Sequence, residues 1–358
     1  MWLRWHTIPI QTLPLKRRAA KQTAGDGVAS LAMPPESSSS QATASSAFDA
    51  GWLDVDHGHR IRYEQAGARD GIPVVMLHGG PGSGASPRQR EIFDASRWRI
   101  VQFDQRGAGL STPQGETKHN HTDALIGDIE ALRERLGIER WLVAGGSWGA
   151  TLALAYAARH RERASGVLLR GVFLANEADL DWFFHGVASL APEAHAEFIA
   201  QVPRRWRRSI VAWLDRCFSR GDPRCAEIAG AWQRYELRLD RERVGAASTA
   251  PSGDGATRLV AKYRVQAHYL ARRCFLGEHA IIRAASSLRG VPVAIVHGEH
   301  DWICRPENAW RVHRAAAGSR LAWAAGARHS PFHASTLALT RSATDAFAAN
   351  GDFSAWPR

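Results

Sequence analysis

The sequence contains little cysteine and no long apolar segment. Four of its 358 residues are cysteines, and they are widely spread, at Cys217, Cys225, Cys274 and Cys304. None belongs to a C-x-x-C pair or to a metal-ligand spacing, so we expect free thiols in a reducing compartment, which points to the cytoplasm. No run of about 18 apolar residues occurs, which predicts that the chain has no transmembrane helix and no membrane partner.

Acidic residues are in the minority, because 35 Asp and Glu residues stand against 46 Lys and Arg residues. The formal net charge is +11 and the sequence pI is near 10.2, a balance that can indicate nucleic-acid binding. The basic residues are nearly all arginines, however, and they are scattered along the chain. The densest cluster, residues 204–208, is short and tryptophan-containing. We interpret it as a solvated helical face and expect no nucleic-acid partner.

Residues 1–46 have the composition of a tail. The segment PPESSSSQATASS is low in complexity and too polar to build a core, so we expect disorder there. The first twenty residues are basic but contain no uninterrupted apolar stretch and no convincing cleavage site, which argues against a secretory signal peptide.

Strand and helix patterns alternate after the tail. The alternation of apolar and polar residues over 51–67 predicts a β-hairpin. Buried strands are predicted within residues 73–82, 98–111, 141–145, 164–174, 291–301 and, more weakly, 320–326. Helices are predicted at 122–138, with Thr122 as the N-cap, and at 150–160 and 335–349. This alternation predicts a mostly parallel sheet with helices on both faces, an α/β fold.

The alternation is interrupted between residues 175 and 289, where the segments are helical, rich in Trp and Arg, and free of strand signals. A loop is predicted inside this region at Ala247 to Thr257. We therefore predict an α/β core formed by residues 47–174 and 290–358, with a helical cap inserted at residues 175–289.

The segment LVAGGSWGATLALAY places one serine between an apolar strand and an alanine-rich helix. Gly145 and Gly149 flank Ser147 in the G-x-S-x-G pattern of a nucleophile elbow, a sharp turn that exposes the serine above the sheet. The helix N-terminus that follows favours negative charge at this place. The alternative is a glycine-rich turn with an incidental serine, and only the rest of the chain can decide between the two.

A serine needs a base and a group that orients the base. In a parallel sheet such groups collect at the carboxyl ends of strands. Asp301 and His329 both follow predicted strands, in the order Ser, Asp, His that this architecture uses. Separately, Asp301 could cap a helix and His329 could be a surface residue, but their joint placement favours a catalytic triad.

The oxyanion of an acyl-transfer reaction needs two backbone donors. One candidate is the N–H of Trp148, which follows the serine. The second candidate is the loop HGGPG after the first buried strand, in which Gly80 lets the backbone approach a substrate. The same loop taken alone could be only a tight turn.

Five segments resemble the proline iminopeptidase family of α/β-hydrolases: HGGPGSG, DQRGAGLSTP, GGSWGATLALAYA, LLRGVFL and HGEHDWICRP. The resemblance runs from about Gly51 to the C-terminus. It implies an α/β-hydrolase core with a helical cap. It also implies an enzyme that needs no metal or other cofactor and removes an N-terminal residue, typically proline, from peptides. Asp104 and Arg106 belong to the DQRG segment, which we interpret as loop scaffolding.

The same resemblance implies a role for each candidate site residue. Ser147 would be the nucleophile, His329 the general base and Asp301 the acid that orients it. Gly80 and Trp148 would form the oxyanion hole.

Two departures concern the substrate's amino group, which the family holds with cap glutamates. Glu236 in AWQRYE matches the first of these glutamates, although a plain surface carboxylate is the alternative, and the second position holds Gln266. A neutral amide can accept a hydrogen bond from the ammonium group, but this bond is roughly half as strong as the charge-assisted bond that a carboxylate would form. Arg328 stands directly before the base, which predicts a bulky cation near the mouth of the site, where it could repel an ammonium group.

Three hypotheses follow from these residues. The first is a serine aminopeptidase that releases proline or another small residue from short peptides. The second is an esterase or amidase on the same scaffold, which Gln266 and Arg328 favour. The third, a binding protein without catalysis, has no need for all of Ser147, Asp301 and His329. The sequence leaves the oligomeric state and the preferred residue open.

Overall fold

The computed structural model describes residues 46–240 and 253–357. The predicted disordered tail therefore lies outside the described residues, apart from its last position. The same holds for residues 247–252 of the predicted loop. The remainder of that loop differs from the prediction, because residues 254–257 already belong to a helix.

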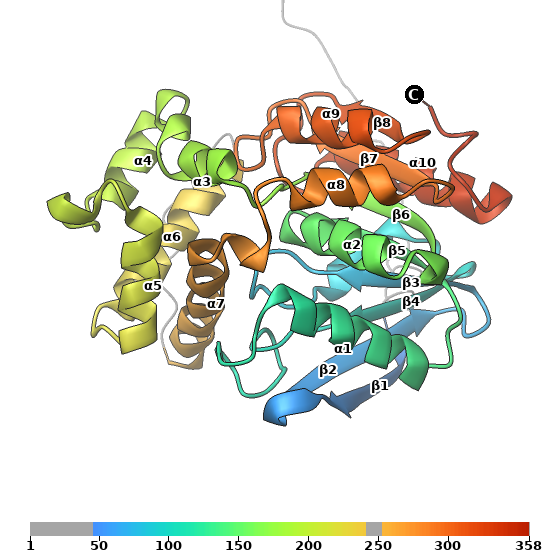
Figure 1. Cartoon of the computed structure of the whole chain (residues 1–358), viewed down its shortest axis with the longest axis horizontal. Helices are drawn as coiled ribbons and strands as arrows, with labels where there is room; N and C mark the ends of the chain where they lie inside the picture. Colours follow the sequence, from blue (N-terminus) through green and yellow to red (C-terminus); the bar gives the residue numbers. More distant parts are fainter. Residues whose placement is uncertain (1–45, 241–252, 358) are drawn as a thin grey trace, which may run out of the picture. The chain divides into compact units, whose positions relative to one another are not determined.

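An eight-stranded sheet forms the centre of the fold, with strand order β1-β2-β4-β3-β5-β6-β7-β8 (Figure 1). The strands are β1 (Ala47–Asp54), β2 (Arg60–Gly67), β3 (Ile72–Leu77), β4 (Trp98–Phe103), β5 (Trp141–Gly146), β6 (Ala164–Arg170), β7 (Val293–Gly298) and β8 (Arg320–Ala324). The predicted hairpin is confirmed as the antiparallel pair β1–β2. Strand β2 is antiparallel to β4, and the other pairs are parallel. The prediction of a mostly parallel sheet is thus confirmed.

Both faces of the sheet are apolar, as expected for strands that are covered on two sides. In β3, Val74 and Met76 point into one hydrophobic cluster, whereas Val75 and Leu77 point into the other. This alternation follows from the two-residue period of a strand. The continuous apolar runs in the sequence are therefore explained by burial on both sides.

Helices cover the two faces unequally (Figure 1). The core helices are α1 (Thr122–Arg135), α2 (Trp148–Arg159), α8 (Ala280–Ser287), α9 (Pro306–Ala315) and α10 (Ala334–Asn350). Buried residues of α1, α2, α8 and α9 join the larger hydrophobic cluster, and those of α10 join the smaller one on the opposite face. None of the described helices combines the length and the apolar character that a bilayer span requires.

The start of α1 differs from the prediction by one residue. His121, not Thr122, is the N-cap, and its side chain accepts a hydrogen bond from the N–H of Ala124. Thr122 instead donates its hydroxyl to the carbonyl of Cys274, far along the chain. Local propensity predicts Thr122 as the N-cap, but a tertiary hydrogen bond engages its side chain instead.

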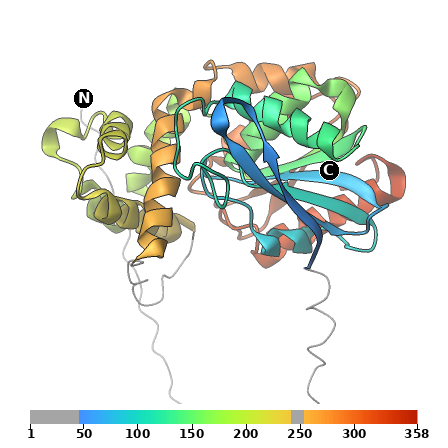
Figure 2. The same cartoon turned by 90° about the horizontal axis from the view of Figure 1, so that it is seen from below.

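The inserted region holds α3 (Glu177–Phe184), α4 (Pro192–Ile199), α5 (Ile210–Arg220), α6 (Cys225–Asp240) and α7 (Asp254–Ala271). Figure 2 shows α7 along the side of these helices that faces the sheet. Two hydrogen bonds tie α7 to the core, from His268 and Tyr269 to Asn120. The last helix of the predicted cap, α8, packs against α2 and α9.

The tryptophans of the inserted region pack in or against the larger hydrophobic cluster. Trp213 and Trp232 are buried in the larger hydrophobic cluster, and Trp182 and Trp206 pack against it. Trp232 also contacts the ring of Tyr263, with 4.8 Å between the ring centroids. The contact between Trp232 and Tyr263 joins α6 to α7 and holds the two helices together.

The DQRG segment acts as a scaffold, as predicted. The carboxylate of Asp104 accepts hydrogen bonds from the N–H groups of Ala85 and Leu110, at 2.7 and 2.8 Å. Arg106 forms a bidentate pair with Asp128 of α1, with both N–O distances at 2.7 Å. Both side chains of this pair are only 2% exposed.

The buried pair yields a prediction about stability. Replacing Arg106 by Met should lower the free energy of unfolding by about 3–5 kcal/mol, because Asp128 would keep a buried charge without its partner. Denaturant unfolding measures this difference. The matched control is Arg159→Met, which removes an exposed pair with Asp123 and should cost less than about 1 kcal/mol. Equal losses in the two variants would contradict the account.

Candidate active site

Ser147 occupies a strained turn between β5 and α2. Its backbone angles are φ 58° and ψ −126°, a combination that non-glycine residues rarely adopt and that is typical of functional sites. The turn requires close backbone approach on both sides. A Cβ on Gly145 would lie 2.1 Å from the carbonyl oxygen of Gly149, and one on Gly149 would lie 2.0 Å from that of Leu77. The G-x-S-x-G pattern therefore reflects contacts that no larger residue permits.

Asp301 and His329 meet at the carboxyl ends of neighbouring strands. Asp301 follows β7, and His329 follows β8. The Nδ1 atom of His329 lies 2.7 Å from Oδ2 of Asp301. Oδ1 of Asp301 accepts hydrogen bonds from the N–H groups of Ile303 and Cys304, at 3.0 and 2.9 Å. The carboxylate is thus held in place, and it fixes the orientation of the imidazole.

The surroundings of Asp301 favour its charged form. Burial alone would raise the pKa of this carboxyl, but the charge and hydrogen bond of His329 outweigh burial and lower the pKa below its ordinary value. The nearby His297 and the N–H of Cys304 act in the same direction. Asp301 is therefore an anion at neutral pH, as an orienting group must be.

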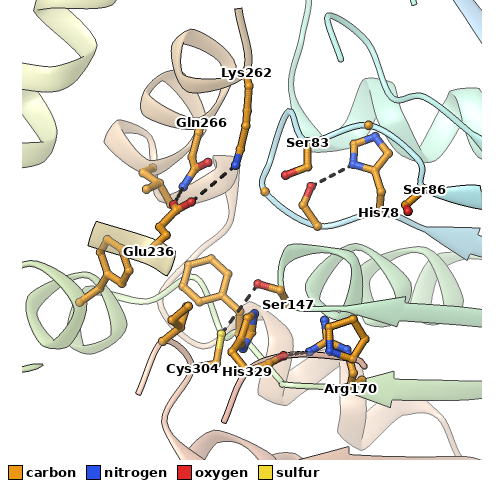
Figure 3. A pocket seen from close by; sticks show the side chains of 18 of the residues that line it. His78, Ser83, Ser86, Ser147, Arg170, Glu236, Lys262, Gln266, Cys304 and His329 are labelled. Carbon is orange, nitrogen blue, oxygen red and sulfur yellow. Dashed lines mark hydrogen bonds and ion pairs between the residues drawn. The ribbon is translucent and has the colours of Figure 1, made fainter. Parts of the chain in front are cut away.

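The hydroxyl of Ser147 is paired with a thiol in this structure. Its Oγ lies 3.9 Å from Sγ of Cys304, and among the described residues no hydrogen bond joins it to His329 (Figure 3). Ser147 and His329 nevertheless line the same pocket. Catalytic hydrogen bonds are often loose without substrate. Cys304 is a neighbour of the serine that the sequence did not single out.

Two residues at the end of β6 also shape the site and were missed by sequence reasoning. Arg170 is partly buried behind the serine turn, lines the pocket, and donates a hydrogen bond to the carbonyl of His329. At Gly171, φ is +53°, and a Cβ would lie 3.0 Å from the His329 ring and 3.3 Å from Asp301. Both residues belong to the segment LLRGVFL, which contributed to the family resemblance. The sequence alone indicated no role for either residue.

Of the two predicted oxyanion residues, Trp148 directly follows the serine and Gly80 lines the same pocket. Trp148 is the first residue of α2, and N–H groups in the first turn of a helix have no partner within it. Gly79 and Gly80 line the pocket. A Cβ on Gly79 would lie 3.5 Å from Cβ of Ser147, so this loop is close to the serine.

The pocket that contains Ser147 has a volume of about 410 Å³ and lies between the sheet edge and the inserted helices. This volume is within the range of small-molecule sites. Part of its wall is apolar and is formed by Phe173, Leu180, Phe183, Leu270 and Ile303.

Among the described residues, no group of three or more His, Cys, Asp or Glu side chains is arranged to hold a metal ion.

The two predicted substrate-binding residues meet on the side of the pocket formed by the inserted helices (Figure 3). Nε2 of Gln266 in α7 donates a hydrogen bond to Oε1 of Glu236 in α6, at 2.6 Å. The hydroxyl of Tyr263 donates to Oε2 of Glu236, at 2.8 Å. Lys262, which sequence reasoning missed, places its Nζ 3.5 Å from the same Oε2. All of these groups except Tyr263 line the pocket.

Arg328, which was expected near the mouth of the site, is not one of the described residues that line the pocket. Its guanidinium lies over the ring of Trp302, 3.7 Å from the centroid, and donates to the carbonyl of Leu239 at 3.5 Å. The cation that lines the pocket beside Glu236 is Lys262.

Comparisons with known proteins place the chain in a family. A family model described as the alpha/beta hydrolase fold matches residues 72–335. A proline iminopeptidase of Xylella fastidiosa is 39% identical over 308 residues, which cover 84% of this chain and 96% of the relative. A probable proline iminopeptidase of Leptolyngbya boryana is 38% identical over 305 residues, covering 84% and 95%. The chain belongs to the proline iminopeptidase family of α/β-hydrolases.

Solved structures confirm the fold of this family member. The proline iminopeptidase of Mycobacterium smegmatis has a TM-score of 0.56 at 20% identity and covers 86% of this chain and 100% of its own. The esterase RhEst1 of Rhodococcus has the same TM-score at 19% identity, covering 84% and 98%. At such identities the two matches support the α/β-hydrolase fold and say nothing about which substrate is cleaved.

The contact between Gly171 and the His329–Asp301 pair leads to a prediction. Gly171→Ala should lower kcat roughly tenfold or more, because its methyl group would displace the imidazole, and small displacements of catalytic groups are costly. The matched control is Gly318→Ala, which has a similar positive φ of +76° but no atom within 4 Å of a Cβ. Both variants should lose similar stability, and only Gly171→Ala should lose activity. Equal activities would contradict the account.

Proposed function

We propose that this protein is a serine aminopeptidase that releases N-terminal proline, or another small residue, from short peptides. The observation that carries the proposal is the strained Ser147 in the same pocket as His329, whose ring is held by Asp301 at 2.7 Å. A serine at a positive-φ turn, a base and an orienting carboxylate are the parts that acyl transfer requires.

The first chemical step forms an acyl-enzyme. Ser147 leaves Cys304 and donates its hydrogen bond to Nε2 of His329, which takes the proton as Oγ attacks the substrate carbonyl. Asp301 accepts from Nδ1 and stabilises the imidazolium that forms. When the carbon–nitrogen bond breaks, the imidazolium returns the proton to the leaving amine.

The second step frees the acyl group. His329 removes a proton from water, the hydroxide attacks the acyl-enzyme, and Oγ of Ser147 leaves with the proton that the imidazole returns. In both steps the tetrahedral oxyanion lies against the N–H groups of Gly80 and Trp148, and the N-terminus of α2 adds favourable partial charge.

The walls of the pocket suit a small N-terminal residue with an amino group. The apolar wall can cover a pyrrolidine ring, and the carboxylate of Glu236 on the cap side can accept hydrogen bonds from the amine. The relatives named proline iminopeptidases, which match this chain over most of its length, support proline as the preferred residue.

An esterase or amidase is the second candidate, and one observation favours it. Glu236 is already bonded by Gln266 and Tyr263 and lies beside Lys262. A carboxylate with these partners holds a substrate ammonium less firmly than a free one. An ester without an amino group would not need Glu236 at all.

Hydrolysis of a proline arylamide, compared with its N-blocked form and a short acyl ester, tests the proposal. We expect the free-amine substrate to be cleaved with the highest kcat/KM. Ser147→Ala should lower kcat by roughly 10³-fold or more for every substrate, because no other group replaces the nucleophile.

Two outcomes would contradict this assignment. Unchanged turnover in Ser147→Ala would remove Ser147 from the chemistry. Cleavage of the ester without cleavage of the free-amine arylamide would exclude the aminopeptidase and leave the esterase. Denaturant unfolding of Ser147→Ala serves as the control that the variant is folded.

A further inference from the structure

On the cap side of the pocket, the ammonium group of Lys262 lies where the N-terminal ammonium of a substrate would bind. Lys262 lies on α7 one helical turn before Gln266, so both side chains are on the same helix face, and both line the pocket. Nζ of Lys262 lies 3.5 Å from Oε2 of Glu236. An N-terminal ammonium that bound Glu236 would enter the same space and form the same kind of ion pair.

The charges on this wall cancel. Glu236 contributes one negative charge, Lys262 one positive charge, and Gln266 none. Asp179 also lines the pocket, but its carboxylate accepts hydrogen bonds from the N–H of Leu174 and the amide of Asn308, at 2.8 and 2.9 Å. It also lies 3.4 Å from Arg305. Asp179 therefore supplies no uncompensated charge to a substrate.

The contact between Lys262 and Glu236 is one that a substrate can displace. Its 3.5 Å length exceeds that of a strong hydrogen bond, and the two side chains are 23% and 21% exposed. The lysine ammonium also lies 4.6 Å from the centroid of the Tyr263 ring. Because a lysine stem is flexible and its ammonium is readily hydrated, Lys262 can move into solvent while the other donors to Glu236 stay.

Gln266 supplies a second feature that points to a ligand. Its Nε2 must face Glu236, because an ionised carboxylate only accepts hydrogen bonds. Its Oε1 is then left without a partner among the described residues, although the side chain is only 5% exposed. A buried acceptor without a partner is costly. A substrate N–H group that entered the pocket would satisfy it.

We propose that Lys262 is a specificity-determining residue that competes with the substrate's N-terminal ammonium for Glu236. This inference rests on the proposed aminopeptidase function. A cationic substrate must displace Lys262 before its amine reaches Glu236 and Oε1 of Gln266. The enzyme consequently binds free-amine ligands more weakly than the carboxylate alone would allow, whereas ligands without a charged amine do not meet this competition.

Competitive inhibition provides the test, with hydrolysis of a short acyl ester as the reporter reaction. Pyrrolidine is cationic at neutral pH and represents the N-terminal ring, whereas N-acetylpyrrolidine has the same ring without the charge. In Lys262→Met, the inhibition constant of pyrrolidine should fall by about fivefold, the scale of a partly exposed ion pair. The inhibition constant of N-acetylpyrrolidine should stay within about twofold, a difference of roughly 0.4 kcal/mol.

Two control variants make the result specific. Lys118→Met removes the other lysine of the described region, which is exposed and outside the pocket, and it should leave both inhibition constants unchanged. Lys262→Arg keeps the charge and should behave as the wild type does. A fall of the pyrrolidine constant in Lys118→Met as well would show a general charge effect and overturn the proposal.

The outcomes separate this inference from the proposed function. Equal pyrrolidine constants in the wild type and Lys262→Met would overturn the role of Lys262 and leave the aminopeptidase intact. Ester hydrolysis without pyrrolidine inhibition in either protein would overturn both, because Glu236 would then bind no amine.

Discussion

The backbone turn at Ser147 is the constraint on which the site depends. Strand β5 ends at Gly146 and helix α2 begins at Trp148, and this sharp turn brings three backbone segments into contact, with β3 on one side and the start of α2 on the other. This contact excludes side chains at Gly145 and Gly149 and forces Ser147 to a positive φ. The same geometry places the hydroxyl at the sheet edge where the loops after β3, β6, β7 and β8 converge.

The sequence was sufficient to predict the sheet, the helices α1, α2 and α10, and the placement of Asp301 and His329 at the ends of neighbouring strands. Buried parallel strands leave a strong apolar signal, and Asp301 and His329 each follow such a strand directly. Helix ends were less predictable, because Thr122 has the right chemistry for an N-cap but bonds to Cys274 instead. Local propensity decides such positions only where no tertiary contact competes.

The composition of the cap wall could not be predicted from motifs. Glu236 and Gln266 are thirty residues apart, and their motifs said nothing of Lys262 or Tyr263, which approach the same carboxylate only once α6 and α7 have packed. Arg328 follows a different course, because its guanidinium lies over the ring of Trp302 and the residue is not among the described residues that line the pocket. Substrate charge preference therefore depends on helix packing more than on the motif that carries the glutamate.

The central claim, that Ser147 is an activated nucleophile, is tested most directly by covalent labelling. An alkyl fluorophosphonate forms a phosphorus–oxygen bond with an activated serine and releases fluoride. After treatment of the full chain, intact mass and peptide mapping should locate one adduct on Ser147, and none should form in His329→Ala, which keeps the serine but lacks the base. An unlabelled wild-type protein, or an adduct on another residue, would contradict the account.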